Sequence, residues 1–192
     1  MMQDIFLETD RLVFRRLTMN DGPLLTDLDS DPEVMRYLTG GRPTPLSRFE
    51  EEILPRVLRY YESYENFGYW AAYEKETQEF IGWFHFRPDK SLGWPDSPTE
   101  IELGYRFKRS AWGKGYGTEG SRALIDKAFT EWGVTQVFAQ AHVENIGSRR
   151  VMEKCGLSYE RDFIYYEEPW DEAQPSVHYV LTAEQYAAMQ SS

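Results

Sequence analysis

The chain has 192 residues, 41% of them hydrophobic, and a formal net charge of −11. We expect one domain over residues 1–192, because this length buries a sizeable core. The acidic balance argues against a general nucleic-acid binder, and no stretch reaches the ~20 apolar residues that span a bilayer. The single cysteine, Cys155, excludes an internal disulfide and a cysteine-based metal cage. We therefore expect a cytoplasmic protein that holds no metal and does not contact a membrane.

The N-terminal part of the chain predicts one strand followed by helices. The strand is expected over residues 9–17 ("TDRLVFRRL"), and a short helix follows near residues 19–28. Ser47 and Glu50 have the spacing of a capping box, which predicts that a further helix begins there. Pro55 lies inside that helix and is expected to kink it.

Four strands and an amphipathic helix are predicted in the middle of the chain. Strands 69–73 ("YWAAY") and 80–86 ("FIGWFHF") are joined by a charged turn and form a hairpin. The next strand is expected over residues 101–107 ("IELGYRF"). A helix over residues 118–131 and a buried strand over residues 135–143 follow.

The C-terminal part predicts a short helix, two strands and a last helix. The short helix covers residues 145–156, and strands are expected over 157–168 and 176–181. Thr182 and Gln185 are placed to cap the last helix. This order of elements predicts an α+β fold with a mixed, mostly antiparallel sheet.

The stretch "AWGKGYGTEG" concentrates glycines directly before the amphipathic helix. Residues 115–120 match the dinucleotide pattern G-x-G-x-x-G, which keeps a nicotinamide-dependent oxidoreductase as a remote alternative, but "KRSAW" separates the preceding strand from the first glycine. Alternatively, Gly113, Gly115 and Gly117 let successive N–H groups face one concavity at the positive end of the helix, which suits a pyrophosphate. A turn that only reverses the chain is the structural alternative.

Two segments together resemble a known family. "YRFKRSAWGKGYGTEGSRALIDKAF" and "VENIGSRRVMEKCGL" resemble the acetyl-CoA-binding core of the general N-acetyltransferase (GNAT) superfamily. "LETDRLVFRRLTMND" and "FIGWFHF" resemble its Rim-type branch of ribosomal-protein acetyltransferases and their relatives. The resemblance implies α/β/α layers, a sheet split at its centre and acetyl-CoA as the acyl donor. It also implies an amine-bearing acceptor, and a homodimer is a further expectation because dimers are common in the family.

The resemblance also implies which residues bind the cofactor. Loop amides would hold the pyrophosphate, backbone groups of Tyr105 and Phe107 would pair with the pantetheine arm, and Asn145 would bond that arm. Trp112 stands where the family signature has Gln or Arg. The expected cofactor-binding residues are Tyr105, Phe107, Trp112, Gly113, Lys114, Gly115, Tyr116, Gly117, Thr118, Asn145 and Ser148.

Acetyl transfer to an amine needs a base and benefits from a proton donor for the departing thiolate. Glu102, which matches an acidic position common in this branch, is proposed as the base, and His85 is the second candidate. Many family members carry a Tyr as the acid where this chain has Met152, so Ser148 is the candidate acid. Each of these residues also has a plain structural alternative as a surface, packing or hydrogen-bonding group.

These observations predict an N-acetyltransferase that moves acetyl from acetyl-CoA to a primary amine within a ternary complex. The acceptor is either a protein N-terminus or a small cationic amine. The alternative is a CoA-binding module without turnover, which the residue at Met152 favours. The N-terminal helices, the hairpin and the last strands are expected to form the acceptor side, with Tyr37, Phe49, Trp83, His85 and Trp170 as lining residues. The acidic stretch "DSDPE" either attracts a cationic amine or is a solvated loop.

Overall fold

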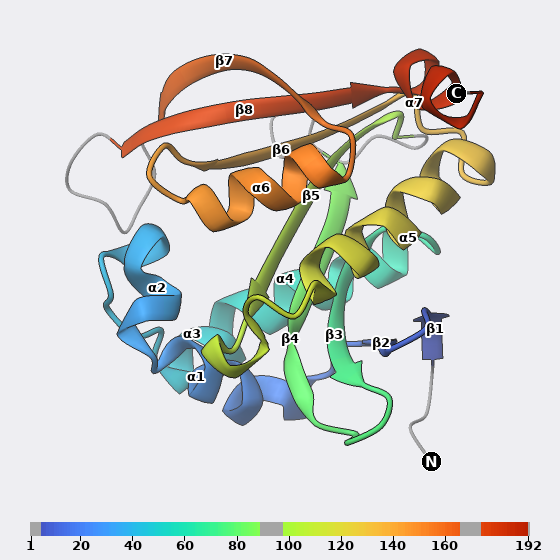
Figure 1. Ribbon diagram of the computed structural model, residues 1–192. Helices are drawn as coiled ribbons and strands as arrows, with labels where there is room; N and C mark the ends of the chain where they lie inside the picture. The colour runs from blue at the N-terminus through green and yellow to red at the C-terminus, as the bar shows by residue number, and fades with distance from the viewer. Residues whose placement is uncertain (1–4, 89–97, 166–173, 192) are drawn as a thin grey trace. The chain divides into compact units, whose positions relative to one another are not determined.

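The computed structural model describes residues 5–88, 98–165 and 174–191, and it confirms the predicted α+β fold (Figure 1). Trp170 and most of the loop predicted after the hairpin lie outside the described residues. The strands are β1 (Ile5–Glu8), β2 (Leu12–Arg16), β3 (Gly68–Glu74), β4 (Phe80–Pro88), β5 (Glu100–Phe107), β6 (Gln136–His142), β7 (Ser158–Tyr165) and β8 (Gln174–Thr182). The α-helices are α1 (Gly22–Asp29), α2 (Pro32–Thr39), α3 (Leu46–Arg48), α4 (Leu54–Ser63), α5 (Tyr116–Thr130), α6 (Ile146–Lys154) and α7 (Ala183–Gln190).

The strands form one mixed sheet in the order β1-β2-β3-β4-β5-β6-β8-β7. β5 and β6 pair in parallel, with a register that runs from Glu100↔Gln136 to Glu102↔Phe138. The pairs β1–β2, β2–β3, β6–β8 and β7–β8 are antiparallel. A parallel pair between antiparallel neighbours needs a crossover, and α5 lies in the chain between β5 and β6.

The N-terminus holds two strands where the sequence predicted one. The predicted strand 9–17 begins instead at Leu12, and β1 precedes it as the outer strand of a hairpin. Thr9 makes the turn: its N–H donates to the Leu12 carbonyl at 3.0 Å, and its Oγ1 accepts from the Leu12 N–H at 3.0 Å. A four-residue edge strand has too few alternations for a periodic pattern to reveal it.

The capping box predicted at Ser47 and Glu50 is wrong. The helix begins at Leu46, with Pro45 before it and no side-chain cap, and a π-helical turn, η2 (Phe49–Ile53), separates α3 from α4. Pro55 explains the π-helical turn. It has no backbone N–H to donate, and its ring crowds the carbonyl four residues earlier. The helix type changes locally before Pro55, and the predicted kink stays a prediction.

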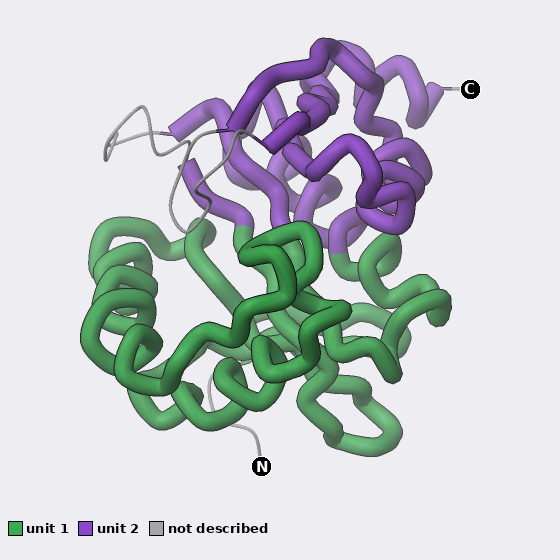
Figure 2. The backbone as a smooth tube through the Cα atoms, turned by 90° about the vertical axis from the view of Figure 1, so that its left-hand side faces the viewer, with its two compact units in different colours: residues 1–85, 105–120 green, residues 86–104, 121–192 purple. Residues whose placement is uncertain are grey.

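The chain forms two compact units (Figure 2). Unit 1 comprises residues 1–85 and 105–120, and unit 2 comprises residues 86–104 and 121–192. The prediction of one domain over residues 1–192 stays a prediction.

In unit 1, helices cover both faces of the strands. On one face, a buried cluster joins side chains of α1, α2, η2 and α4 to β3 and β4, and Trp83 packs against it. On the other face, the first turns of α5 pack closely on Phe84 and Phe14 at Gly120. A Cβ at this glycine would lie only 2.4 Å and 2.7 Å from ring carbons of the two phenylalanines. Adjacent strand residues point to opposite faces, so Trp83 and Phe84 mark the two layers.

Unit 2 has its own core of aliphatic and aromatic side chains. Its fully buried members come from β4, β5, α5, β6 and β8 and include Phe86, Ile101, Leu124, Val137 and Leu181. Gly156 ends α6 with a φ of +91°, as expected for a glycine cap. Thr182 and Gln185 form the predicted capping box of α7.

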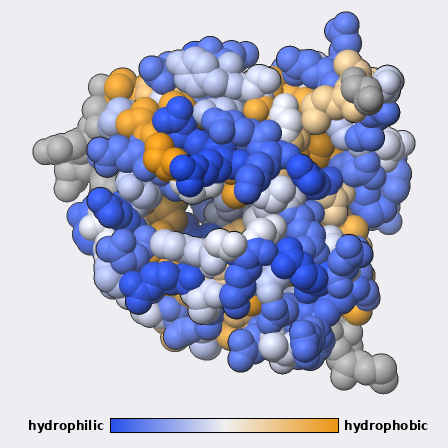
Figure 3. Space-filling model, in the orientation of Figure 1, coloured by the Kyte–Doolittle hydropathy of each residue, from blue (hydrophilic) through white to orange (hydrophobic). Residues whose placement is uncertain are grey.

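Hydrophilic residues cover most of the face displayed in Figure 3, in keeping with the charge of the chain.

Candidate functional site

The glycine loop lies between a short 3₁₀ turn (Arg109–Ala111) and the start of α5 at Tyr116. Gly113 and Gly115 have φ angles of +73° and +85°, which side chains rarely adopt. A Cβ on Gly113 would have no protein atom within 4 Å. Both glycines and Lys114 between them are exposed, so the loop presents bare backbone to whatever approaches it.

Backbone amides in this loop are the strongest chemical signal in the described residues. Among the described residues, no backbone carbonyl accepts a hydrogen bond from the N–H groups of Gly113, Lys114, Gly115 and Gly117. Unpaired amides at the start of a long helix form an anion site, since the helix adds its positive end. The loop therefore fits the pyrophosphate of the expected cofactor, and Lys114 adds a positive charge at its rim.

Side chains from other elements of unit 1 fasten this loop. The guanidinium of Arg11 donates to the Lys114 carbonyl at 2.9 Å and to Glu119 at 2.7 Å. Glu119 also accepts from the Thr9 hydroxyl at 2.6 Å. Burial opposes the ionisation of Glu119, but hydrogen bonds from Thr9 and Arg11 outweigh it and lower the pKa of this carboxyl. The Tyr116 hydroxyl donates to Glu74. The loop is thus held from outside while its amides stay available.

The end of β5 leads directly into the loop. Rings of Tyr105 and Phe107 stack on one face of this strand and lie against Phe84. Trp112 is 48% exposed, and its indole N–H donates to the Phe107 carbonyl at 2.9 Å. That bond ties the start of the loop to the strand and already uses one lone pair of a carbonyl expected to face the pantetheine arm.

The remaining expected cofactor residues belong to unit 2. Asn145 is the N-cap of α6, and its Oδ1 accepts from the Ser148 N–H at 3.1 Å. Both residues are partly exposed. The cap uses the amide oxygen of Asn145, which leaves its NH₂ group as the donor suited to a ligand carbonyl.

Glu102, the expected base, lies on β5 in unit 2 and forms an ion pair with Arg87 of β4. The Arg87 side chain is 3% exposed and that of Glu102 is 19% exposed. A buried guanidinium needs such a partner, so the pair gives Glu102 a structural role in addition to any chemical one.

His85, the second candidate base, packs in an aromatic cluster of unit 1. Its ring stacks on Trp83 at 5.8 Å between centroids and meets the edge of Tyr69 at 5.3 Å. This environment favours the packing alternative for His85. Trp83 in turn lies under the guanidinium of Arg106, whose carbon is 5.0 Å from the ring centroid.

The position that carries a tyrosine in many family members is buried here. Met152 on α6 is 2% exposed, so it belongs to the core of unit 2 and offers no proton. Cys155 is also buried, and burial raises the pKa of its thiol to about 11. Neither residue supplies the general acid.

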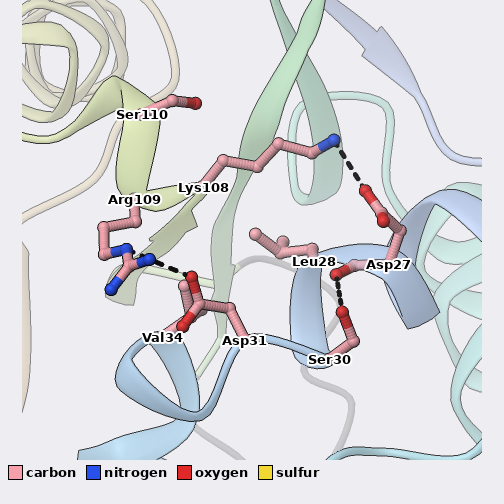
Figure 4. Close-up of a pocket in the computed structure, with 8 residues that line it drawn as sticks. All are labelled: Asp27, Leu28, Ser30, Asp31, Val34, Lys108, Arg109 and Ser110. Atoms are coloured by element: carbon pink, nitrogen blue, oxygen red, sulfur yellow. Dashed lines mark hydrogen bonds and ion pairs between the residues drawn. The ribbon is translucent and has the colours of Figure 1, made fainter.

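A cavity of about 610 Å³ opens in unit 1 beside α1 and α2 (Figure 4). Two ion pairs border it: Lys108 with Asp27 at 2.7 Å, and Arg109 with Asp31 at 3.4 Å. The lining residues are Asp27, Leu28, Ser30, Asp31, Val34, Lys108, Arg109 and Ser110. Leu28 and Val34 are the buried apolar residues of this lining, and the other lining residues are polar or charged.

The acidic stretch "DSDPE" is not a free anionic surface. Asp29 is 1% exposed and accepts from Arg106 at 2.5 Å, and Asp31 is paired with Arg109. These carboxylates are neutralised by cations of the same unit, which weakens their attraction for a cationic amine. The expectation of a solvated loop also fails for Asp29, because its side chain is buried.

Sequence reasoning missed Arg11 and Glu119, which are 108 residues apart. Arg11 was included in a predicted strand and Glu119 in an amphipathic helix, and no spacing rule links two such positions. Arg87 and Arg106 were missed for the same reason. In a strand, alternation alone gives the face of an arginine but not its partner.

No helix within the described residues is long and apolar enough to cross a membrane. In the same part of the chain, no group of three or more His, Cys, Asp or Glu side chains is placed to hold a metal ion.

Comparison with known proteins identifies the family. The model of the acetyltransferase (GNAT) domain matches residues 11–158. The FsC-acetyl coenzyme A-N(2)-transacetylase of Aspergillus fumigatus is 32% identical over 192 aligned residues, which cover 96% of this chain and 79% of that protein. Both matches include the glycine loop and α6.

Solved structures agree on the fold. An AAC(6')-Ib structure in complex with parmomycin and acetyl-CoA has a TM-score of 0.72 at 24% identity and covers 93% of this chain and 97% of its own. RimL, a ribosomal L7/L12 alpha-N-protein acetyltransferase in complex with coenzyme A, has a TM-score of 0.75 at 14% identity, with coverage of 93% and 98%. With its loop of unpaired amides, its helix order and its matched domain, the chain belongs to the GNAT family of acetyltransferases, whose acyl donor is acetyl-CoA.

Proposed function

We propose that the protein transfers the acetyl group of acetyl-CoA to a primary amine, by direct attack while both substrates are bound. The observation that carries the proposal is the set of loop amides without a protein acceptor, at Gly113, Lys114, Gly115 and Gly117. The family model and the named acetyltransferases among the relatives favour this enzyme over a CoA-binding module without turnover.

The chain's own residues divide the work of holding the donor. The loop amides and Lys114 bind the pyrophosphate, backbone groups of Tyr105 and Phe107 align the pantetheine arm, and the NH₂ group of Asn145 donates to it. Thr118 and Ser148 are further candidates for hydrogen bonds to the cofactor. When bound, acetyl-CoA supplies a thioester carbonyl that is activated toward an amine.

Three residues are candidates for the proton transfers of the reaction. Glu102 accepts the proton of the incoming amine, directly or through water, while Arg87 fixes the position of its carboxylate. His85 is the second candidate, although its packing between two rings favours a structural role. Ser148 is the candidate donor to the leaving thiolate, because Met152 cannot serve.

We place the acceptor in the cavity of unit 1. Its size is within the ~300–1,000 Å³ of small-molecule sites, and it holds both charged and apolar lining residues. The relatives act on different acceptors by name: FsC in one case, the ribosomal protein L7/L12 in another. The cavity volume admits a small amine or the N-terminal residues of a protein, and the acceptor screen below distinguishes the two.

An acceptor screen tests the proposed function. Purified protein is mixed with acetyl-CoA and a panel of amines that contains FsC, aminoglycosides, polyamines and short peptides, and free CoA thiol is measured. We expect thiol release that depends on an amine, with acetylated product confirmed by mass spectrometry. Cys155 will add little background, because its thiol is buried and its pKa is raised to about 11. Acetyl-CoA binding without release across the whole panel would instead support the module without turnover.

A homodimer and a cytoplasmic location stay predictions. Sedimentation velocity of the purified protein, with and without CoA, measures the first directly.

A further inference from the structure

Arg11 lies directly before β2 and contacts both the glycine loop and the first turn of α5. Its Nη1 donates to the Lys114 carbonyl at 2.9 Å, and its Nε donates to Glu119 at 2.7 Å. The guanidinium carbon lies 4.7 Å from the centroid of the Tyr116 ring. One planar side chain therefore spans from the middle of the loop to the first turn of α5.

The bond to the Lys114 carbonyl decides where the next amide points. In a planar trans peptide the C=O and N–H groups point in opposite directions. Because the Lys114 carbonyl is directed at Arg11, the N–H of Gly115 is directed away from Arg11. That N–H belongs to the set of loop amides without a protein acceptor.

The loop sequence itself leaves this orientation open. A flip of the peptide changes ψ of Lys114 and φ of Gly115, and glycine adopts either sign of φ with similar ease. Gly115 has a φ of +85° in the structure. In the flipped form the carbonyl, rather than the N–H, would face the phosphate. The choice between the two forms must come from outside the loop.

Glu119 holds Arg11 in position. Its negative charge near the proposed pyrophosphate site is also the charge that Arg11 offsets. Its carboxylate accepts from the Arg11 Nε, from the Arg11 backbone N–H at 2.9 Å and from Thr9 at 2.6 Å. A carboxylate in the first turn of α5 would repel a pyrophosphate bound there. The ion pair with Arg11, at 2.6 Å, offsets this charge.

We infer that Arg11 is a positioning residue for the pyrophosphate site: it selects the peptide orientation that presents the Gly115 N–H to the phosphate, and it neutralises Glu119. The inference rests on the proposed function, since it assumes that the loop binds acetyl-CoA. It predicts that Arg11 matters only for ligands that carry the pyrophosphate.

The test compares two donors and a matched variant. Affinities for acetyl-CoA and for acetyl-pantetheine, which lacks the pyrophosphate and the nucleotide, are measured for the parent, Arg11→Lys and Arg16→Lys. Affinity for acetyl-CoA is measured by calorimetry. Affinity for acetyl-pantetheine, which is expected to bind more weakly, is measured by the ligand-induced shift of the melting temperature. Arg11→Lys keeps the charge but loses the fork that reaches two acceptors at once. Arg16 is the matched control, because it lies on β2 and donates to the Glu65 carbonyl instead.

We expect Arg11→Lys to weaken acetyl-CoA binding about tenfold, the cost of one charge-assisted hydrogen bond, and to change acetyl-pantetheine binding less than about twofold. Arg11→Gln, which also removes the charge, will weaken acetyl-CoA further, and Arg16→Lys will change neither donor. The Arg11 side chain is 48% exposed, so we expect both Arg11 variants to fold with nearly the parent melting temperature.

Two results would overturn the inference alone: equal loss for both donors, which indicates a general structural role, or unchanged acetyl-CoA affinity in the Arg11 variants. Failure of the parent itself to bind acetyl-CoA would instead refute the proposed function, and the inference would be refuted with it.

Discussion

Gly113 and Gly133 offer a matched pair of substitutions that separates backbone strain from ligand binding. Their φ angles are +73° and +69°, and a Cβ on either one would have no protein atom within 4 Å. Gly113 lies before α5 in the proposed pyrophosphate loop, and Gly133 lies just after α5. Alanine at either position has the same conformational problem and the same free space, but only one position is at the proposed site.

The expected loss of stability is the same for both variants. A residue with a Cβ in the left-handed region costs about 1–2 kcal/mol. For a chain of this size, each kcal/mol lowers the melting temperature by about 2–4 °C, so both variants should melt about 2–8 °C below the parent. Thermal unfolding followed by circular dichroism measures this part of the prediction.

The expected loss of affinity differs. At Gly113, alanine favours a negative φ, which turns at least one loop amide away from the pyrophosphate. The loss of one hydrogen bond to a charged group is worth about 1.5–3 kcal/mol, so Gly113→Ala should raise the Kd for CoA roughly 10- to 100-fold. Gly133→Ala should leave that Kd unchanged. Equal Kd values for the two variants in titration calorimetry would refute the assignment of the loop.

Further outcomes follow from the same geometry. Gly115→Val should abolish measurable CoA binding in calorimetry, because valine at a φ of +85° is strained and brings a branched side chain against the guanidinium 3.4 Å away; near-parent affinity would contradict the site. Glu102→Gln should lower the melting temperature, because the buried Arg87 loses its charged partner, and it should keep the Kd for CoA and lower turnover, most at low pH; parent rates at every pH would remove this residue as the base. Gly120→Ala should destabilise the protein by about 1–3 kcal/mol in denaturant unfolding, because its Cβ would overlap two phenylalanine rings, and an unchanged midpoint would show the packing to be looser. Burial opposes the ionisation of Asp21, but its bonds to Arg15 and the backbone lower its pKa, so this carboxylate stabilises the fold above its unfolded pKa and the effect is lost as pH falls through the lower folded pKa. Asp21→Asn should therefore lower the melting temperature at neutral pH and reduce its fall in acid; an unchanged acid profile would contradict the ion pair.

The elements nearest the proposed chemistry were predictable because their signals are local. Glycines followed by an apolar stripe gave the loop and α5, which begins at Tyr116 rather than at the predicted residue 118. Alternation gave the hairpin of β3 and β4, and Gly156 marked the end of α6. These features depend on residues within one or two turns of each other.

The features that sequence reasoning missed depend on tertiary contacts. The Ser47 and Glu50 pattern fits a capping box, yet Pro45 and Pro55 fix the helix start and the π turn between them. Glu119 finds Arg11 only because the fold brings β2 to the start of α5. The pairing of Asp29 with Arg106 was equally hidden, and it changed an expected acidic surface into a buried ion pair.

The proposed function depends on the binding of the acetyl-CoA pyrophosphate by the amides of the glycine loop. Backbone amide NMR of labelled protein, titrated with CoA, tests it most directly because each N–H reports its own environment. We expect the largest shifts at Gly113, Gly115 and Gly117. Saturable binding that leaves these three signals unchanged, with the shifts clustered elsewhere, would contradict this expectation.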